Sequence, residues 1–418
     1  APLLGRHRGT GDSIDPAAIL ASVGMVAAGT VAAVVPLVLA MRWAVSRARW
    51  GRPTLLLAAR RLAADPLPAA AVVGVASVCV GLFAYGTLLQ SSAKRTIDAK
   101  AGVFVGGEVS VVVPEIEAPP APLAARSTAV RWVPDVGTDG PPVDVLGVDP
   151  ATFEAGAFWD RRLADAPLAE LLPALRGTAR GGRVPALAVG DVADRVDLDL
   201  DQAGEVAVAV VARPRAFPGL RSRPLIVIDR RHLGGDDGER QLWSNLPVAE
   251  VAGAVRDAGL EARFAVTMDR VFDAPAFYTL DWSFGFLRGT AAWAATVASL
   301  GFLVHLDLRR RRALPAEVVL VTMGLRRRAQ AASRVLELAV PLFAGCLLGT
   351  ALALAGASGS HRTVDLVPYV PPAAILDVPA AQLATVVAVV LAALPLLAAA
   401  VHLRRPGPAG EVLRSELV

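Results

Sequence analysis

Two clusters of arginine flank a short segment between two long apolar runs. Guanidinium groups bind lipid phosphates, and basic residues beside a membrane-spanning segment keep their loop on the cytoplasmic side. The spacing predicts a helix of about 15 residues that lies along the inner membrane surface and is held there at both ends. The alternative is a solvated basic loop that only sets the topology. The predicted membrane-face anchors are Arg309, Arg310, Arg311, Arg312, Arg326, Arg327 and Arg328.

The segment between the clusters carries apolar side chains at a spacing that suits a groove on a partner protein. Gly324, near its end, would either allow a close approach of the partner or terminate the helix. The alternative is a helix that only packs against its own bundle. The residues predicted to contact a partner are Glu317, Leu320, Val321, Met323, Gly324 and Leu325.

Motifs that would indicate catalysis are absent from the sequence. A P-loop requires a lysine after glycine, and neither of the two lysines, Lys94 and Lys100, follows a glycine. HExxH and GxSxG do not occur, the five histidines are scattered, and Cys79 and Cys346 lie inside apolar runs. We therefore expect no enzyme activity and no catalytic, cofactor-binding or metal-binding residues in this chain.

The composition is typical of a membrane protein: 54% of the residues are hydrophobic, 19% are charged, and the mean hydropathy is +0.50. Five uncharged runs each reach the roughly 18 residues that cross the hydrocarbon of a bilayer. Arginines follow the first, third and fifth runs, which places these ends in the cytoplasm. The net charge of +4 is modest, so no nucleic-acid partner is expected.

These features predict a polytopic α-helical membrane protein of the inner or plasma membrane. It has five transmembrane helices and a large α+β extracytoplasmic domain inserted between the second and the third. The chain begins with Ala1 and is expected to be a fragment or trimmed at its start. The predicted parts, in chain order, are an outside loop 1–15, span 16–41, a basic amphipathic cytoplasmic helix 42–65, span 66–90, the outside domain 91–284, span 285–306, the cytoplasmic coupling helix 307–334, span 335–357, an outside loop 358–377, span 378–403 and a cytoplasmic tail 404–418.

Within the outside domain, runs rich in Val and Ile predict strands, and leucine or valine at helical spacing predicts two helices. The strands are expected at Glu108–Val113, Val143–Val148, Val206–Val211 and Pro224–Ile228, and the helices at Pro167–Leu175 and Val248–Ala258.

Two further patterns concern the helices. Gly74, Gly81 and Gly86 in the second apolar run predict close packing against another helix. The pentapeptide Pro16–Leu20 recurs at Pro372–Leu376, in both places before an Ala/Val-rich run. A structural repeat would make the first span the last helix of a preceding half; chance similarity in an alanine-rich chain is the alternative.

The layout and the coupling segment resemble the FtsX/MacB-like family of ABC permeases. The closest local similarity is Pro315–Arg326, where an acid, a leucine three residues later and an apolar-Gly pair precede basic residues. Glu337 with Gly345 and Gly349 is similar to the family's entry into its third span, and Val143–Pro150 resembles a segment common in such permeases. The resemblance covers residues 47–418 and suggests the second half of a two-repeat permease. Pro315 and the Val-Thr-Met stretch depart from the family's usual helix formers.

The resemblance implies a permease subunit that transmits the motion of a separate ATP-binding subunit to the outside domain. ATP and Mg would be bound by that partner, and none by this chain. The cargo would be a lipid, a lipoprotein or a hydrophobic compound. The alternatives are a membrane-anchored receptor or scaffold, or a regulator of a cell-wall hydrolase that transports nothing.

Overall fold

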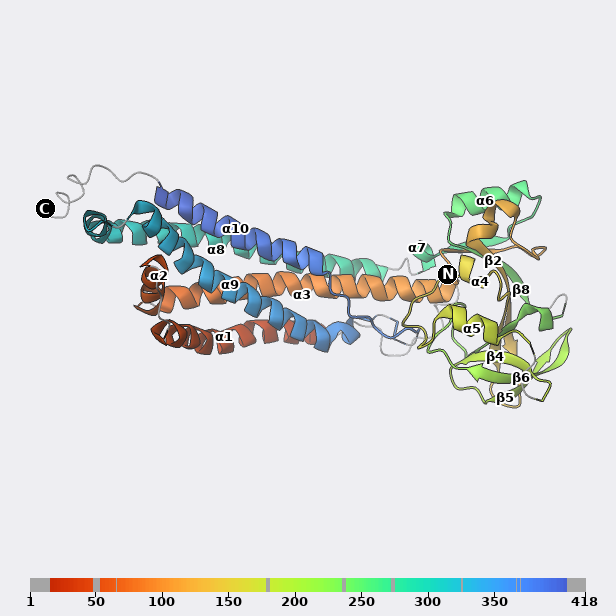
Figure 1. The fold of residues 1–418 in the computed structure, drawn as a ribbon. Coiled ribbons are helices and arrows are strands. Elements are labelled where there is room, and N and C mark those ends of the chain that lie inside the picture. The colour runs from red at the N-terminus through yellow and green to blue at the C-terminus, as the bar shows by residue number, and fades with distance from the viewer. Residues whose placement is uncertain are drawn as a thin grey trace. The chain divides into compact units, whose positions relative to one another are not determined.

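The computed structural model describes residues 16–47, 53–64, 66–177, 181–234, 238–271, 275–324, 326–365, 367–368 and 370–403. The predicted loop 1–15, the predicted tail 404–418 and Leu325 lie outside the described residues. The chain divides into two units: unit 1 is Ala1–Ser92, Tyr278–Val364 and Leu376–Val418, and unit 2 is Ala93–Phe277 and Asp365–Ile375. Figure 1 traces the elements along the chain.

Long helices make up unit 1. Four of the helices begin at a proline, whose fixed φ and missing N–H suit the first helical position. The helix α3 contributes residues to both units, as does α8 at its start. The helices are α1 (Pro16–Arg47), α2 (Pro53–Ala64), α3 (Pro66–Val105), α8 (Pro275–Thr322), α9 (Arg327–Ser360) and α10 (Ala380–Leu403).

Three helices in the described part of the chain are long and apolar enough to cross a membrane: Pro66–Val105, Tyr278–Val304 and Arg328–Val364. The sequence predicts five, so that number is only partly supported. In α1 and α10 the described apolar stretches are Val26–Ala40 and Ala380–Ala393, shorter than the roughly 18 residues that a span requires. The protein is thus a mixed α and β protein, and its described residues include three helices of membrane-spanning length.

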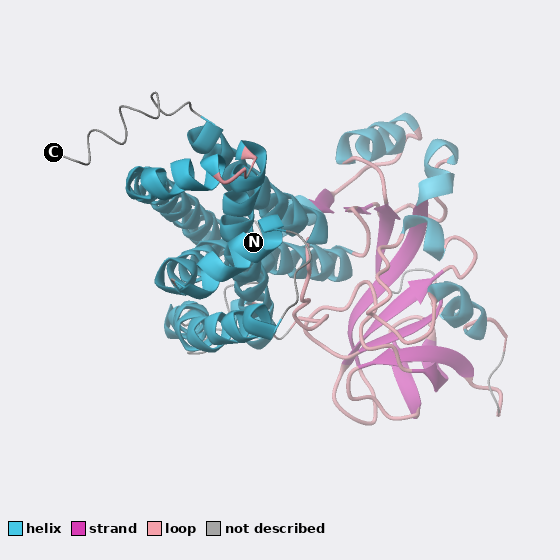
Figure 2. Ribbon diagram, turned by 60° about the vertical axis from the view of Figure 1, so that its left-hand side comes forward, coloured by secondary structure: helices cyan, strands magenta, loops and turns pink. Residues whose placement is uncertain are grey.

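Unit 2 contains a nine-stranded mixed sheet in the order β5-β6-β4-β7-β3-β2-β8-β1-β9 (Figure 2). The pairs β3–β7 and β4–β6 are parallel, and the other neighbours are antiparallel. The strands are β1 (Val109–Val112), β2 (Ser127–Val136), β3 (Val143–Val148), β4 (Val184–Val189), β5 (Arg195–Leu200), β6 (Gly204–Ala212), β7 (Leu225–Asp229), β8 (Glu239–Ser244) and β9 (Phe264–Thr267).

All six secondary-structure elements predicted for this domain are confirmed. The strands correspond to β1, β3, β6 and β7, and the helices to α5 (Leu168–Ala174) and α6 (Val248–Asp257). The shorter helices α4 (Phe153–Gly156) and α7 (Met268–Val271) and the remaining five strands were not predicted. The main segment of unit 2, Ala93–Phe277, is shorter at both ends than the predicted domain 91–284, and unit 2 also contains Asp365–Ile375 of the predicted outside loop.

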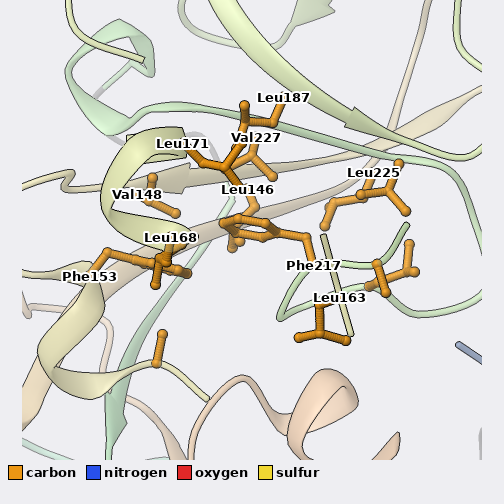
Figure 3. Close-up of a cluster of buried hydrophobic side chains, with 14 of the residues drawn as sticks. Leu146, Val148, Phe153, Leu163, Leu168, Leu171, Leu187, Phe217, Leu225 and Val227 are labelled. Carbon is orange, nitrogen blue, oxygen red and sulfur yellow. The ribbon is translucent and has the colours of Figure 1, made fainter. Parts of the chain in front are cut away.

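The central strands carry apolar residues on both faces, since successive side chains of a strand point to opposite sides. On β3, Leu146 and Val148 belong to one buried cluster and Val143 and Val145 to the other. The first cluster includes Phe153, whose ring stacks on that of Phe217 at a centroid distance of 5.3 Å (Figure 3). A sheet covered on both faces explains why β7 begins with four apolar residues in a row, and why every residue of β3 is buried.

The two copies of the repeated pentapeptide have different conformations. Pro16–Leu20 forms the start of α1, whereas Pro372–Leu376 is not helical and precedes α10 by several residues. The shared sequence therefore does not correspond to a shared local structure.

Candidate functional site

The segment predicted to couple to a partner is helical, but it is the continuation of α8 rather than a separate helix. Helix α8 runs unbroken from Pro275 to Thr322 and includes the first arginine cluster. Arginine, alanine and leucine favour helix, so the change from apolar to basic residues at Arg309 does not end it. Pro315 lies inside α8 and lacks an N–H, so the helix can bend there without a loop. Of the predicted contact residues, Glu317, Leu320 and Val321 lie on this part of α8.

The chain reverses between α8 and α9, inside the predicted coupling segment. Gly324 has a φ of +94°, a left-handed conformation that commonly terminates helices. This supports the second of its two predicted roles, that of ending the helix. Met323, beside it, has 78% of its surface exposed. Arg326 is the N-cap residue of α9, and Arg327 and Arg328 begin the helix.

Helix α9 approaches α3 closely where both carry small residues. A Cβ at Gly349 would lie 2.4 Å from the carbonyl oxygen of Ser77, and one at Gly345 would lie 2.7 Å from that of Val73. A Cβ at Gly81 would lie 3.2 Å from the carbonyl oxygen of Gly349. The predicted packing role of Gly81 is therefore confirmed, and Gly345 and Gly349 supply the opposite side of the same contact.

Polar side chains fix the helices of unit 1 to one another. Thr30 and Ser77 share a hydrogen bond of 2.9 Å, and so do Tyr85 and Ser360. The hydroxyl of Ser91 donates to Asp377 at 2.5 Å. Hydrogen bonds between helices favour one arrangement in a membrane, where water does not compete.

Two more polar side-chain pairs join parts of unit 1. The amide of Gln90 donates to Asp281 at 2.5 Å. Glu337, which the family resemblance singled out, lies 4.0 Å from the guanidinium of Arg61 on α2. The last pair gives Glu337 a role in attaching α2 to α9.

The last turns of α3 are embedded in the core of unit 2. A Cβ at Gly102 would lie 2.5 Å from the ring of Phe158, and one at Gly106, where φ is +92°, would lie 2.5 Å from the ring of Trp243. The backbone of α3 therefore touches aromatic rings of the sheet domain directly, and any larger residue would separate them.

The segment between α9 and α10 is attached to this end of α3 by a buried ion pair. The ammonium of Lys100 lies 2.7 Å from both carboxylate oxygens of Asp365 and donates to the carbonyl of Val367 at 2.5 Å. The two side chains are 2% and 7% exposed. Thr96, one turn earlier on α3, accepts a hydrogen bond of 2.9 Å from the backbone N–H of Ile375. The connection 365–375 is thus fixed to α3 near both of its ends, a feature that the sequence analysis did not foresee.

Two other charged groups are desolvated within unit 2. The guanidinium of Arg221 lies over the ring of Trp132 at 3.6 Å, and burial lowers its pKa. Burial also raises the pKa of Asp144, although this carboxylate accepts a hydrogen bond from the N–H of Asp135. Asp144 lies on β3, and Arg221 lies over the ring of Trp132 on β2. Both charged groups therefore belong to the packing of unit 2.

In the part of the chain that the structure describes, no group of three or more His, Cys, Asp and Glu could hold a metal ion. Cys79 and Cys346 are buried and form no disulfide among the described residues. The contacts found in the described residues are of two kinds: helices packed through small residues, and the end of α3 joined to the connection 365–375 inside unit 2.

Comparison of the chain with protein-family models and with curated proteins found no match. The family resemblance rests on the residues of the coupling segment and on the order of apolar runs along the chain.

Proposed function

We propose that this chain is the membrane subunit of an ABC system of the FtsX/MacB-like kind. In this proposal it crosses the membrane five times and receives motion from a separate ATP-binding subunit at Glu317–Leu325. It passes that motion to unit 2, which lies outside the cell or in the periplasm. There unit 2 acts on a lipid, a lipoprotein or a hydrophobic compound. ATP and Mg belong to the partner.

The observation that carries the proposal is the double attachment of unit 2. Helix α3 has 40 residues, and at 1.5 Å per residue it is about 60 Å long, twice the hydrocarbon thickness of a bilayer. A membrane-spanning α3 would therefore extend well beyond the bilayer. The connection between α9 and α10 is fixed to the same end of α3 by Lys100 and Asp365. A displacement of α9 or α10 would then reach unit 2 together with that of α3.

The turn between α8 and α9 supports the coupling role. Met323 is exposed, and Gly324 reverses the chain, so the turn presents an apolar side chain that a partner could cover. The basic residues Arg326 and Arg328 stand at the N-terminus of α9, where the helix dipole disfavours cations. Anionic lipids or acidic residues of a partner would compensate for that cost.

Co-purification tests the proposal. Met323→Asp and Gly324→Arg are expected to remove a candidate ATP-binding subunit, co-expressed with this chain, from the purified complex. A charge at an apolar contact, or a large residue at a left-handed position, would disrupt the docking turn. Phe264→Asp is the matched control, because it places the same charge on an exposed apolar residue of unit 2.

The readout is the molar ratio of ATP-binding subunit to this chain after affinity purification in detergent. Loss of the partner in both turn variants, with retention in Phe264→Asp, supports the proposal. If the wild-type chain retains no ATP-binding subunit, or if the turn variants retain as much as the control, the coupling role is wrong. A receptor or scaffold without an ATPase would then be the better explanation.

A further inference from the structure

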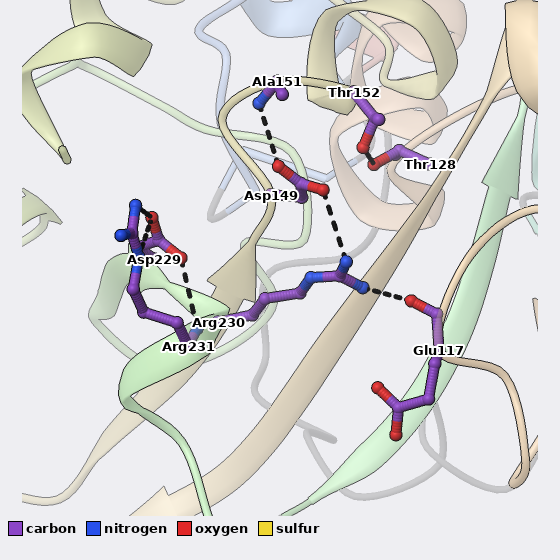
Figure 4. Close-up of polar contacts among 8 residues, drawn as sticks. All are labelled: Glu117, Thr128, Asp149, Ala151, Thr152, Asp229, Arg230 and Arg231. Carbon is purple, nitrogen blue, oxygen red and sulfur yellow. Dashed lines mark hydrogen bonds and ion pairs between the residues drawn. The ribbon is translucent and has the colours of Figure 1, made fainter.

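Three arginines of unit 2 converge on the loop that follows β1. The Nη2 atoms of Arg131 and Arg240 lie 3.8 Å and 3.2 Å from the same oxygen, Oε1 of Glu117. Arg230 donates from Nη1 to the backbone carbonyl of Glu117 at 2.5 Å and also pairs with Asp149 at 3.3 Å (Figure 4). Three guanidinium groups from β2, β8 and the end of β7 therefore surround one short loop.

Two of these arginines are direct neighbours across the sheet. In the antiparallel register of β2 and β8, Arg131 is paired with Arg240. Like charges opposite each other on adjacent strands destabilise a sheet. Their side chains are only 11% and 20% exposed, so they are also partly desolvated. Two cations held side by side in this way favour the binding of an anion between them.

Glu117 now occupies that position, but it is held weakly. Its side chain is 67% exposed, and exposed ion pairs contribute only about 0–1 kcal/mol. Figure 4 shows that Arg230 contacts the backbone of Glu117 while the carboxylate points away from that guanidinium. The arginines, in contrast, are positioned independently of the glutamate: Arg131 donates to the carbonyl of Gly234, and Arg240 donates to that of Pro114 at 3.0 Å.

We propose that Arg131 and Arg240 form a binding site for the phosphate group of a phosphomonoester, that Arg230 holds the loop beside it through the backbone of Glu117, and that the Glu117 carboxylate occupies this site when no ligand is bound. A carboxylate from outside would only replace one carboxylate by another. A phosphomonoester carries a charge of about −1.5 to −2 and three acceptor oxygens, and so gains more from two adjacent guanidinium groups. The phosphate belongs either to a soluble ester or to a lipid headgroup. The proposal concerns unit 2 alone and does not depend on coupling to an ATPase.

Titration calorimetry on the full-length chain in phosphatidylcholine nanodiscs tests this site. The probes are glycerol 3-phosphate and dihexanoyl phosphatidic acid, with dihexanoyl phosphatidylcholine as the control without a phosphomonoester. Saturable binding of at least one phosphomonoester is expected. Equal affinity for both identifies a soluble ester as the ligand class, and binding of the lipid alone identifies a headgroup.

The variants separate a binding site from ordinary electrostatic attraction. Glu117→Gln removes the competing carboxylate from an exposed position, so it is expected to tighten phosphate binding about tenfold without affecting folding. Arg240→Gln is expected to weaken binding about tenfold or more. Arg195→Gln removes an exposed arginine from β5, at the far edge of the sheet order, and should leave the affinity unchanged.

Two results would overturn the proposal. One is the absence of saturable binding of either phosphomonoester in both the wild type and Glu117→Gln. The other is a loss of affinity in Arg195→Gln as large as that in Arg240→Gln, because binding would then follow net charge rather than this site. Glu117→Gln keeps the test decisive even when Arg240→Gln unfolds, since its expected effect is a gain.

Discussion

Helices α3 and α8 both contain an apolar stretch long enough to cross a membrane. The two stretches differ in the fraction that is buried inside the protein. In α3, 44% of the stretch is buried inside the protein, whereas in α8 only 6% is buried. Small residues and hydroxyls line α3, and at Gly345 and Gly349 the backbone of α9 approaches the backbone of α3 closely. Large apolar side chains line α8 and remain exposed, namely Tyr278, Trp282, Phe286, Trp293, Val297, Leu300 and Val304.

Two helices of similar apolar composition can therefore differ in kind: one is packed inside the protein, and the other exposes most of its apolar surface. The side chains of α3 must fit against α9 and against the sheet of unit 2. Substitutions on α3 should therefore change the free energy of unfolding. Most side chains in the apolar stretch of α8 are exposed, and an exposed apolar surface of this size marks contact with a membrane or with another protein. Substitutions on α8 should therefore leave the free energy of unfolding almost unchanged.

The largest effect is expected at the end of α3. Lys100→Ala leaves the carboxylate of Asp365 buried without its cation, and breaking such a pair costs about 3–5 kcal/mol. The measurement is chemical unfolding of the full-length chain in detergent. The double variant Lys100→Met, Asp365→Leu should recover most of this loss, because it leaves neither charge behind. A single variant as stable as the wild type would show that the pair does not hold the connection.

A medium effect is expected where α9 meets α3. Gly349→Val would bring side-chain atoms into the carbonyl of Ser77, and such overpacking costs about 1–3 kcal/mol. Gly301→Val on α8 is the matched control, since no described atom lies within 4 Å of a Cβ there. Thermal unfolding in the same detergent should separate the two variants. Equal losses in both would contradict the contrast between the helices.

The smallest effect is expected from shortening a side chain. Val73→Ala removes fully buried atoms on α3 and should cost about 1–2 kcal/mol. Val297→Ala makes the same change on α8, where the side chain is 63% exposed, and should cost less than about 0.5 kcal/mol. Comparison of the two unfolding midpoints sharpens the contrast, and a larger loss for Val297→Ala would reverse it.

Local patterns in the sequence were sufficient for part of this architecture. Val-rich runs predicted four strands, and three of them, β1, β3 and β7, are buried along their whole length. Gly81 was recognised as a packing residue because a glycine in an apolar helix has few other uses. For Gly324 the sequence left two roles open, close approach of a partner or termination of the helix, and its φ of +94° supports the second. Each of these predictions needs only a few consecutive residues of the chain.

Other features were missed because their cause lies elsewhere in the chain. Strand β8 contains Glu239, Arg240 and Gln241, and its polar residues are buried only because neighbouring strands supply partners, such as Ser127 for Ser244. Strand β5 does alternate between exposed and buried residues, and its period of two could have identified it. The ion pair of Lys100 joins residues 265 positions apart, and no local pattern indicates it. The only local sign of this ion pair is a lysine placed among alanines and a glycine, at residues 99–102.

The attachment of residues 365–375 to unit 2 changes how this part of the protein can be isolated. The chain passes between the two units at Ser92–Ala93, Phe277–Tyr278, Val364–Asp365 and Ile375–Leu376. A fragment of residues 91–284 would therefore leave Lys100 without the carboxylate of Asp365 and Thr96 without the backbone N–H of Ile375. A synthetic peptide of residues 361–377 should bind such a fragment and raise its melting temperature, and the same peptide with Asp365→Asn should do so less. Unit 2 is thus completed by a stretch of chain that begins almost ninety residues after its main segment ends.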